Sequence, residues 1–154
     1  MATIEVTKVI EFEMAHALHN HKGLCKNVHG HTYKLEVTIK GAPKNTPSMT
    51  DDGMLVDFAD FKEILQNEIK DRFDHALILN QLDPRTAMVE SSPLFGRAMG
   101  YSFNPTCENL TIKIAEILTD FIRFNYNNEF YLTTIRLWET PTSFATWRTE
   151  DNPM

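Results

Sequence analysis

Apolar and polar residues alternate in two stretches of the first forty positions, and this pattern predicts two β-strands. The clearest stretch follows His31, where four apolar side chains alternate with Lys34, Glu36, Thr38 and Lys40: Tyr33, Leu35, Val37 and Ile39. An earlier stretch from Ile4 to Phe12 has a similar alternation, interrupted near Thr7-Lys8, which predicts a strand with a possible bulge. A loop from His19 to Asn27 joins them, so an antiparallel pair is the simplest arrangement.

A period of three to four residues predicts two helices later in the chain. Asp57 is a suitable N-cap for the first, which is expected over about Phe58 to Arg72. Pro105-Thr106-Cys107-Glu108-Asn109 opens the second, with Thr106 as its N-cap. An apolar stripe along this helix should face the core.

The remaining segments complete the predicted fold. Phe73 to Asn80 is interpreted as a buried connector with His75 as a core residue, and Gln81 to Asn104, which has no clear period, as a lid or an interface. Glu129 to Glu139 predicts a strand whose alternation slips once, and 143–148 a final strand. The order β-β-α-α-β-β predicts an α+β two-layer sandwich, a four-stranded antiparallel sheet with two helices on one face, in one domain over 1–154.

Length, charge and cysteine content exclude several classes of protein. The 154 residues contain no apolar run of membrane-spanning length and no secretory signal, so we expect a cytoplasmic protein without membrane partners. Two cysteines make no disulfide framework. A net charge of −6 without a basic run argues against nucleic acid as a partner.

Five of the six histidines fall between residues 16 and 31. On one strand, His29 and His31 project to the same face roughly 6 to 7 Å apart, and antiparallel pairing returns His16 to their side. Three imidazoles with a free position are typical of an open zinc site. His19 and His21 have the same spacing of two, and spacing alone does not exclude them.

Two further groups can carry proton chemistry. Cys25 lies four residues before His29 and can be a zinc ligand, a proton-transferring thiol or an idle residue. Asp74-His75 places a carboxylate beside an imidazole, which can orient the ring and support its protonated form. The dipeptide alone is weak support, because adjacent side chains often point apart.

Six ordered blocks together resemble the 6-pyruvoyl-tetrahydropterin synthase family across nearly the whole chain. They are Phe12-Glu13-Met14-Ala15-His16, Cys25-x3-His29-Gly30-His31, Gly53-Met54-Leu55-Val56-Asp57-Phe58, Phe73-Asp74-His75, Pro105-Thr106-Cys107-Glu108-Asn109-Leu110 and Trp138-Glu139-Thr140. The three residues between the cysteine and the first histidine of His-Gly-His resemble the bacterial branch, which makes 6-carboxy-5,6,7,8-tetrahydropterin for queuosine.

The resemblance implies a tunnelling fold, with subunits assembled as trimers or hexamers and sites between them. It implies that His16, His29 and His31 hold zinc, that Cys25 and the Asp74–His75 pair transfer protons, and that Glu139 anchors a pterin with Thr106 and Glu108 beside it. The implied substrate is 7,8-dihydroneopterin triphosphate, cleaved to 6-carboxytetrahydropterin, acetaldehyde and triphosphate.

Two features depart from the family pattern: 81–104 is a long insertion, and Cys107 stands where Ser or Thr is usual. They leave other activities open. One is triphosphate elimination that keeps the side chain and gives 6-pyruvoyl-tetrahydropterin. Another is a non-catalytic, zinc-stabilised module that binds a pterin or assists assembly.

Overall fold

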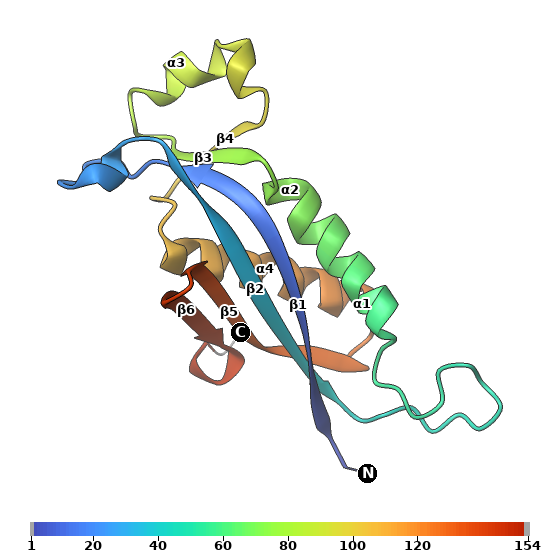
Figure 1. Ribbon diagram of the computed structural model, residues 1–154. Coiled ribbons are helices and arrows are strands. Elements are labelled where there is room, and N and C mark those ends of the chain that lie inside the picture. Colours follow the sequence, from blue (N-terminus) through green and yellow to red (C-terminus); the bar gives the residue numbers. More distant parts are fainter. Residues whose placement is uncertain (1, 153–154) are drawn as a thin grey trace.

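The computed structural model describes residues 2–152 and contains one curved, mixed sheet of six strands in the order β4-β3-β1-β2-β5-β6. The expected four-stranded antiparallel sheet is therefore wrong in strand number and in direction, although the α+β class is correct. Figure 1 shows β1 and β2 as long curved strands that cross the whole molecule, with β5 and β6 beside them.

The first two strands, β1 (Ile4–His16) and β2 (His29–Gly41), pair antiparallel along their whole length. The expected bulge near Thr7-Lys8 is absent between these strands, because the register runs unbroken from Ile4 opposite Gly41 to His16 opposite His29. Lys8 interrupts the apolar pattern but still faces inward, with its ammonium 5.7 Å from the centre of the Phe58 ring.

The predicted C-terminal strands are present as β5 (Phe130–Thr140) and β6 (Ser143–Arg148). The expected slip in β5 is a register shift opposite Thr38 and Ile39 of β2, where Thr134 and Leu132 are the successive partners and Thr133 is passed over. The extra residue lets Leu132 and Ile135 both point into the core.

Two parallel strands were not expected. The predicted connector is β3 (Ala76–Asn80), which pairs parallel with β1, and β4 (Ala98–Tyr101) pairs parallel with β3. All five residues of β3 are buried, and the first four form a continuous apolar run like that of a buried connector. The segment 81–104 is not structureless, since it also contains α3 (Thr86–Glu90) and the 3-10 turn η3 (Pro93–Phe95).

The predicted helices cover the inward face of the sheet. The first is continuous from α1 (Phe58–Leu65) through a π-turn, η2 (Gln66–Lys70), to α2 (Asp71–Phe73), and Asp57 caps it by accepting from the Ala59 N–H. The second is α4 (Cys107–Asn125), which packs on β5 and β6 and is capped by Thr106. The core between helices and sheet contains Phe12, Met14, Tyr33, Leu35, Val37, Ile39, Phe61, Leu65, Ile69, Ile114, Leu118 and Ile135.

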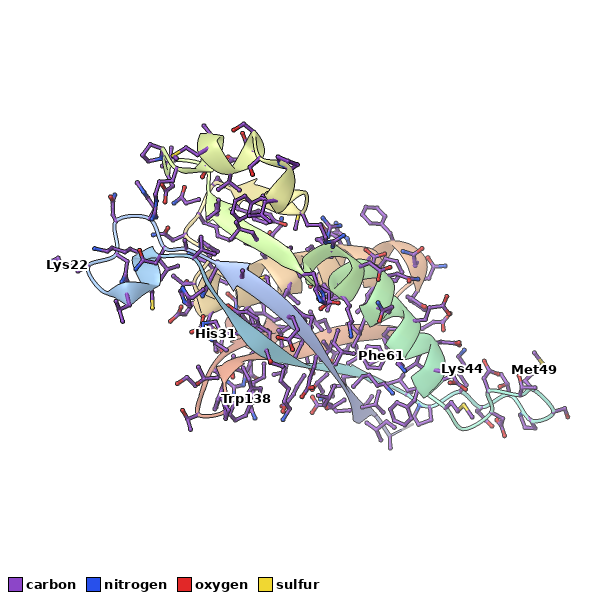
Figure 2. The ribbon with its side chains drawn as sticks, turned by 45° about the horizontal axis from the view of Figure 1, so that its top comes forward. Lys22, His31, Lys44, Met49, Phe61 and Trp138 are labelled. Carbon is purple, nitrogen blue, oxygen red and sulfur yellow. The ribbon has the colours of Figure 1, made fainter. Side chains whose placement is uncertain are left out.

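Long loops lie at the two ends of the molecule. Figure 2 shows Lys22, in the loop between β1 and β2, far from Met49, in the loop that leads from β2 to α1. The first loop contains one 3-10 turn, η1 (Leu24–Lys26). Among residues 2–152, no helix combines the length and the apolar character needed to cross a membrane.

Candidate active site

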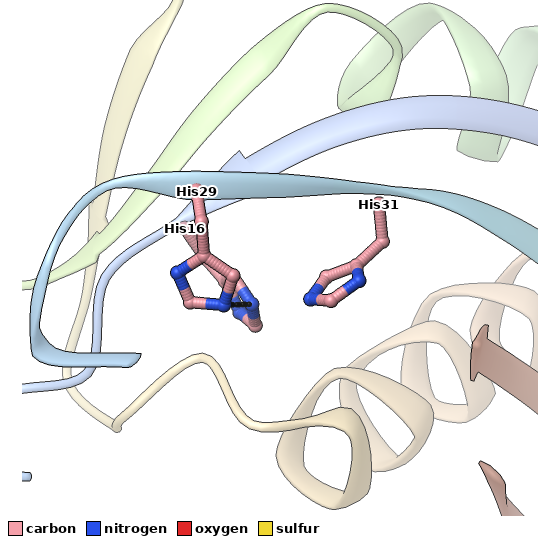
Figure 3. A group of neighbouring side chains, drawn as sticks. All are labelled: His16, His29 and His31. Carbon is pink, nitrogen blue, oxygen red and sulfur yellow. Dashed lines mark hydrogen bonds between the residues drawn. The ribbon is translucent and has the colours of Figure 1, made fainter. Parts of the chain in front are cut away.

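Three histidine side chains meet at the end of the β1–β2 pair, as the sequence predicts. His16 lies directly opposite His29, and His31 lies opposite Met14, two residue pairs further along the ladder. Even-numbered residues of β1 and odd-numbered residues of β2 face inward, so the three rings share one side of the sheet. One ligand atom from each ring lies within 4.8 Å of the others, and Figure 3 shows the rings gathered below the two strands.

Hydrogen bonds fix which ring nitrogens face this centre. A carbonyl oxygen only accepts, so His16 Nδ1–H donates to Pro105 O at 2.6 Å and His29 Nδ1–H donates to Asn27 O at 2.8 Å. The two Nε2 atoms then face each other at 3.0 Å, as drawn in Figure 3. Burial lowers the pKa of His16, which favours the neutral ring.

This arrangement fits a shared metal ion. With both Nδ1 protons donated to carbonyls, two neutral rings would direct lone pairs at each other, which is repulsive without a cation between them. A carbonyl behind each imidazole is also the usual outer partner of a metal-bound histidine. The site can therefore hold a metal with His16, His29 and His31 as ligands.

Glu139 brings a carboxylate to the same centre. Its Oε1 lies 3.7 Å from His16 Nε2 and 4.0 Å from His31 Nε2, and it accepts a 3.3 Å hydrogen bond from the Tyr33 hydroxyl. Tyr33 is fully buried, and this burial, together with the nearby Glu139 charge, raises its pKa far above the usual value. Its hydroxyl therefore stays protonated and serves as a donor to Glu139.

The three predicted substrate-binding residues line one small cavity. Thr106, Glu108 and Glu139 surround a space of about 350 Å³, together with Cys107. The first two lie at the N-terminus of α4, and Glu139 lies where β5 bulges against β6. The Cys107 thiol donates to Leu137 O, and burial raises its pKa to about 11.

The predicted thiol and the alternative histidines lie in the loop between β1 and β2. Within residues 2–152, no hydrogen bond or ion pair joins Cys25 to the three histidine rings. His19 and His21 are outside the group of three: the His19 ring faces Asp83 at 3.7 Å, and His21 Nδ1 accepts from the Gly23 N–H.

Asp74 and His75 form a pair, but at a different place. His75 Nδ1 lies 3.1 Å from Asp74 Oδ2, and Asp74 Oδ1 accepts from the Glu13 N–H. Partial burial acts to raise the pKa of Asp74, but the hydrogen bonds from Glu13 and His75 lower it overall. The interpretation of His75 as a core residue is wrong, because its side chain is 74% exposed and its backbone has a left-handed φ of 58°.

The pair borders the outward face of the sheet. His75 shares a cavity of about 680 Å³ with Glu13 and Thr32, whose side chains hydrogen-bond to each other on that face. His16 and Tyr33 face inward, on the opposite side of the same two strands. His31 also lines this cavity, but among residues 2–152 no hydrogen bond or ion pair joins Asp74 or His75 to the three histidine rings of the same chain.

Sequence reasoning missed several residues that shape this region. Tyr33 was counted only among the alternating apolar positions of a strand, although its hydroxyl contacts Glu139. Asp83, Arg85 and Asn104 had no assigned role. Arg85 and Asn104 form hydrogen bonds with the loop that carries Cys25, and Asp83 accepts hydrogen bonds from Arg85. An Asp-Pro-Arg turn was the available signal for the first two.

Fold and site together define an α+β protein in which a three-histidine centre adjoins a small, polar pocket that contains carboxylates. Comparison with known proteins narrows this class. Residues 5–150 match the family model described as 6-pyruvoyl tetrahydropterin synthase. The chain belongs to this family, which consists of pterin-processing enzymes, and it is an enzyme of the lyase type.

Individual relatives agree with the family match. A 6-carboxy-5,6,7,8-tetrahydropterin synthase of Haemophilus influenzae is 37% identical over 146 residues, covering 94% of this chain and 98% of its own. One of Rickettsia bellii is 35% identical, with coverages of 92% and 98%. The solved 6-pyruvoyl tetrahydropterin synthase of Plasmodium vivax has the same fold, with a TM-score of 0.72, 18% identity and coverages of 96% and 98%.

Proposed function

We propose that this protein is a zinc-dependent lyase that cleaves 7,8-dihydroneopterin triphosphate to 6-carboxy-5,6,7,8-tetrahydropterin, acetaldehyde and triphosphate, a cytoplasmic step in queuosine synthesis. The observation that carries the proposal is the meeting of three imidazoles with the Glu139 carboxylate at one end of the sheet. The carboxy product is favoured by the relatives named for it and by the spacing of Cys25 from His29.

His16, His29 and His31 would hold the zinc ion, since three neutral imidazoles suit this metal and leave a position for substrate. Bound there, zinc would acidify a coordinated hydroxyl of the substrate side chain and polarise a developing carbonyl. Pro105 O and Asn27 O would keep two of these rings oriented through their Nδ1 protons.

Glu139 would hold the pterin ring. A carboxylate accepts two parallel hydrogen bonds from an amino group and an adjacent N–H, which is the donor pair on one edge of a pterin. Thr106 and Glu108 line the same cavity and would contact the ring from the start of α4. Binding there would place the substrate side chain at the histidine centre, because Glu139 lies within 4 Å of two of the rings.

Proton transfer would use Cys25 and the Asp74–His75 pair. Asp74 would orient the His75 ring through the contact at Nδ1, which leaves Nε2 free to exchange a proton with the substrate. Since the pair borders the opposite face of the sheet, we propose that it acts on the histidine centre of another copy. The active enzyme is then a homo-oligomer, a trimer or a hexamer.

Product analysis tests the reaction. Zinc-loaded protein is incubated with 7,8-dihydroneopterin triphosphate, and the products are identified by mass spectrometry. Acetaldehyde with 6-carboxytetrahydropterin is the expected result. A 6-pyruvoyl product would show that the protein eliminates triphosphate instead. An absence of turnover by an oligomer with bound zinc would refute the substrate assignment.

Mixing of two inactive variants tests the shared site. His29→Ala lacks a metal ligand and His75→Ala lacks the acid/base ring, so neither should turn over substrate alone. Co-assembled, they should recover part of the activity, since some sites then combine an intact metal centre with an intact His75. If mixed oligomers form without recovery, both groups act within the same chain.

The non-catalytic alternative predicts a different outcome for Cys25→Ala. A proton-transferring thiol predicts lost turnover with zinc content retained. A cysteine that ligates structural zinc predicts loss of both metal and stability.

A further inference from the structure

The part of the loop that carries Cys25 is held by polar contacts and buries little apolar surface. Its 3-10 turn, Leu24–Lys26, has no buried residue, and the Leu24 side chain is 85% exposed. A segment with so little buried surface samples many conformations unless other contacts restrain it. The position of the Cys25 thiol therefore depends on the hydrogen bonds made by this loop.

One restraint comes from the loop between β3 and α3. Arg85 Nη1 donates to Lys26 O at 2.6 Å, one residue after Cys25, and Leu18 N donates to the carbonyl of Cys25 itself at 2.9 Å. Two consecutive carbonyls of the loop are thus each fixed by a donor from another part of the chain. The other donors of Arg85 reach the Asp83 carboxylate, with Nη2 2.6 Å from Oδ2 and Nε 2.9 Å from Oδ1.

Asp83 is placed to hold Arg85 in this position. Its side chain is only 2% exposed, while that of Arg85 is 46% exposed. The guanidinium lowers the pKa of Asp83 to about 2, so the carboxylate is ionised at every pH at which the protein would act. Bonds to both carboxylate oxygens fix the plane of the guanidinium, which aims the remaining nitrogen at Lys26 O.

A second restraint starts from the same segment. The Asn104 side-chain amide accepts from His19 N at 2.8 Å and donates to His19 O at 3.0 Å, which fixes both polar groups of that residue. Asn80, at the end of β3, donates to the same Asn104 oxygen at 3.3 Å. Both ends of the residue 81–104 segment thus hold the Cys25 loop, the first through Arg85 and the second through Asn104.

We propose that Asp83 and Arg85 are positioning residues for Cys25, and that the segment 81–104 serves as a brace that aims the thiol of the active site. The proposal rests on the proposed function, in which Cys25 transfers a proton. A shift of about 1 Å in a reacting group can lower the rate roughly a hundredfold. The hydrogen bond from Arg85 to Lys26 can therefore affect turnover, although neither residue needs to contact the substrate.

Arg85→Met tests the tether, because methionine keeps much of the side-chain length but has no donor. We expect faster hydrogen exchange of the amides over residues 18–27 and faster alkylation of Cys25 by iodoacetamide, followed by peptide mass spectrometry to separate it from Cys107. Turnover should fall roughly tenfold to a hundredfold, with KM changed by less than about twofold. A structural role alone would not produce a local change at the thiol with KM preserved.

Two comparison variants sharpen the result. Arg123→Met removes an arginine from another surface pair, with Asp120 on α4, and should leave exchange, alkylation and turnover unchanged. Arg85→Lys keeps the charge but cannot bridge the carboxylate and Lys26 O together, so it should resemble Arg85→Met. Wild-type behaviour of Arg85→Lys would overturn the bridging role.

The readouts also separate this proposal from the proposed function. Unchanged exchange and alkylation in Arg85→Met would refute the tether, whatever the enzyme's activity. If wild-type protein fails to turn over the pterin, the proposed function fails, while a local change at Cys25 in the variant would still establish that Arg85 fixes this loop.

Discussion

Replacement of Tyr33 by phenylalanine removes one oxygen atom from the buried side of the candidate site. The hydroxyl donates to Glu139 Oε1 at 3.3 Å, and the ring stacks on Phe12 with centroids 5.5 Å apart. Phenylalanine keeps this stacking and creates no cavity of consequence. The variant therefore isolates the hydrogen bond to Glu139 from the packing around it.

The size of the effect follows from the geometry of this bond. A hydrogen bond to a charged group typically contributes about 1.5 to 3 kcal/mol. Its 3.3 Å length exceeds the usual range for O–H donors, which lowers our expectation to about 1 kcal/mol. Since Glu139 is the proposed pterin anchor, loss of its orientation should weaken pterin binding about fivefold.

Binding of 7,8-dihydroneopterin, measured by isothermal titration calorimetry, tests this expectation without turnover. Zinc content should match the wild type, because all three histidines remain and His16 and His29 keep their hydrogen bonds to Pro105 O and Asn27 O. Tyr126→Phe, on a tyrosine near Phe121 and Phe130 at the other end of α4, is the matched control and should bind normally. Equal affinity of Tyr33→Phe and wild type would refute the reasoning.

Three further predictions concern acid stability, thiol reactivity and the core. Hydrogen bonding to Arg85 lowers the pKa of Asp83 from 3.8 to about 2, so its stabilisation is complete above about pH 4 and is lost as the pH falls toward 2. Allowing for the half-exposed guanidinium, Asp83→Asn should lower the free energy of unfolding by about 1 to 2 kcal/mol at pH 6 and by little at pH 2. Urea unfolding at each pH measures this, and equal losses at both would contradict a stabilising role of the ionised Asp83. Because burial raises the pKa of Cys107 to about 11, its thiolate fraction at pH 8 is about a hundredfold below that of an ordinary thiol, and Ellman's reagent should label Cys25 first. Leu118→Ala, at a fully buried position on α4, should cost about 2 to 5 kcal/mol in free energy of unfolding, and a loss below about 1 kcal/mol would show that the site can collapse.

The long antiparallel strands and the helices could be predicted because the apolar residues of each recur with a regular period and its ends are clearly marked. Alternation over Tyr33 to Ile39 fixes which side of β2 is buried, and register alone then brings His16 opposite His29. The N-caps Asp57 and Thr106 likewise mark the helix starts.

The parallel strands could not be recognised, because a strand buried on both faces has no alternation. Ala76 to Asn80 is short, and its first four residues are all apolar. Its partner Ala98 to Tyr101 is only half buried and also lacks a hydrophobic period. Without β3 in the sheet, the exposed position of His75 could not be predicted. It depends on β3 running parallel to β1, which is a long-range property of the chain.

The three candidate metal ligands all belong to one hairpin, and His16 and His29 are already held opposite each other by its backbone. The 12 residues between His16 and His29 form a loop whose ends the strand pairing already holds together. A metal ion bound by both histidines would therefore add little stability by restricting the unfolded chain. Binding of the ion would instead mainly fix the histidine rings and the carbonyl groups to which two of them donate. We expect that stripping the ion with a chelator loosens the tip of this hairpin and leaves the remaining sheet and both helices folded.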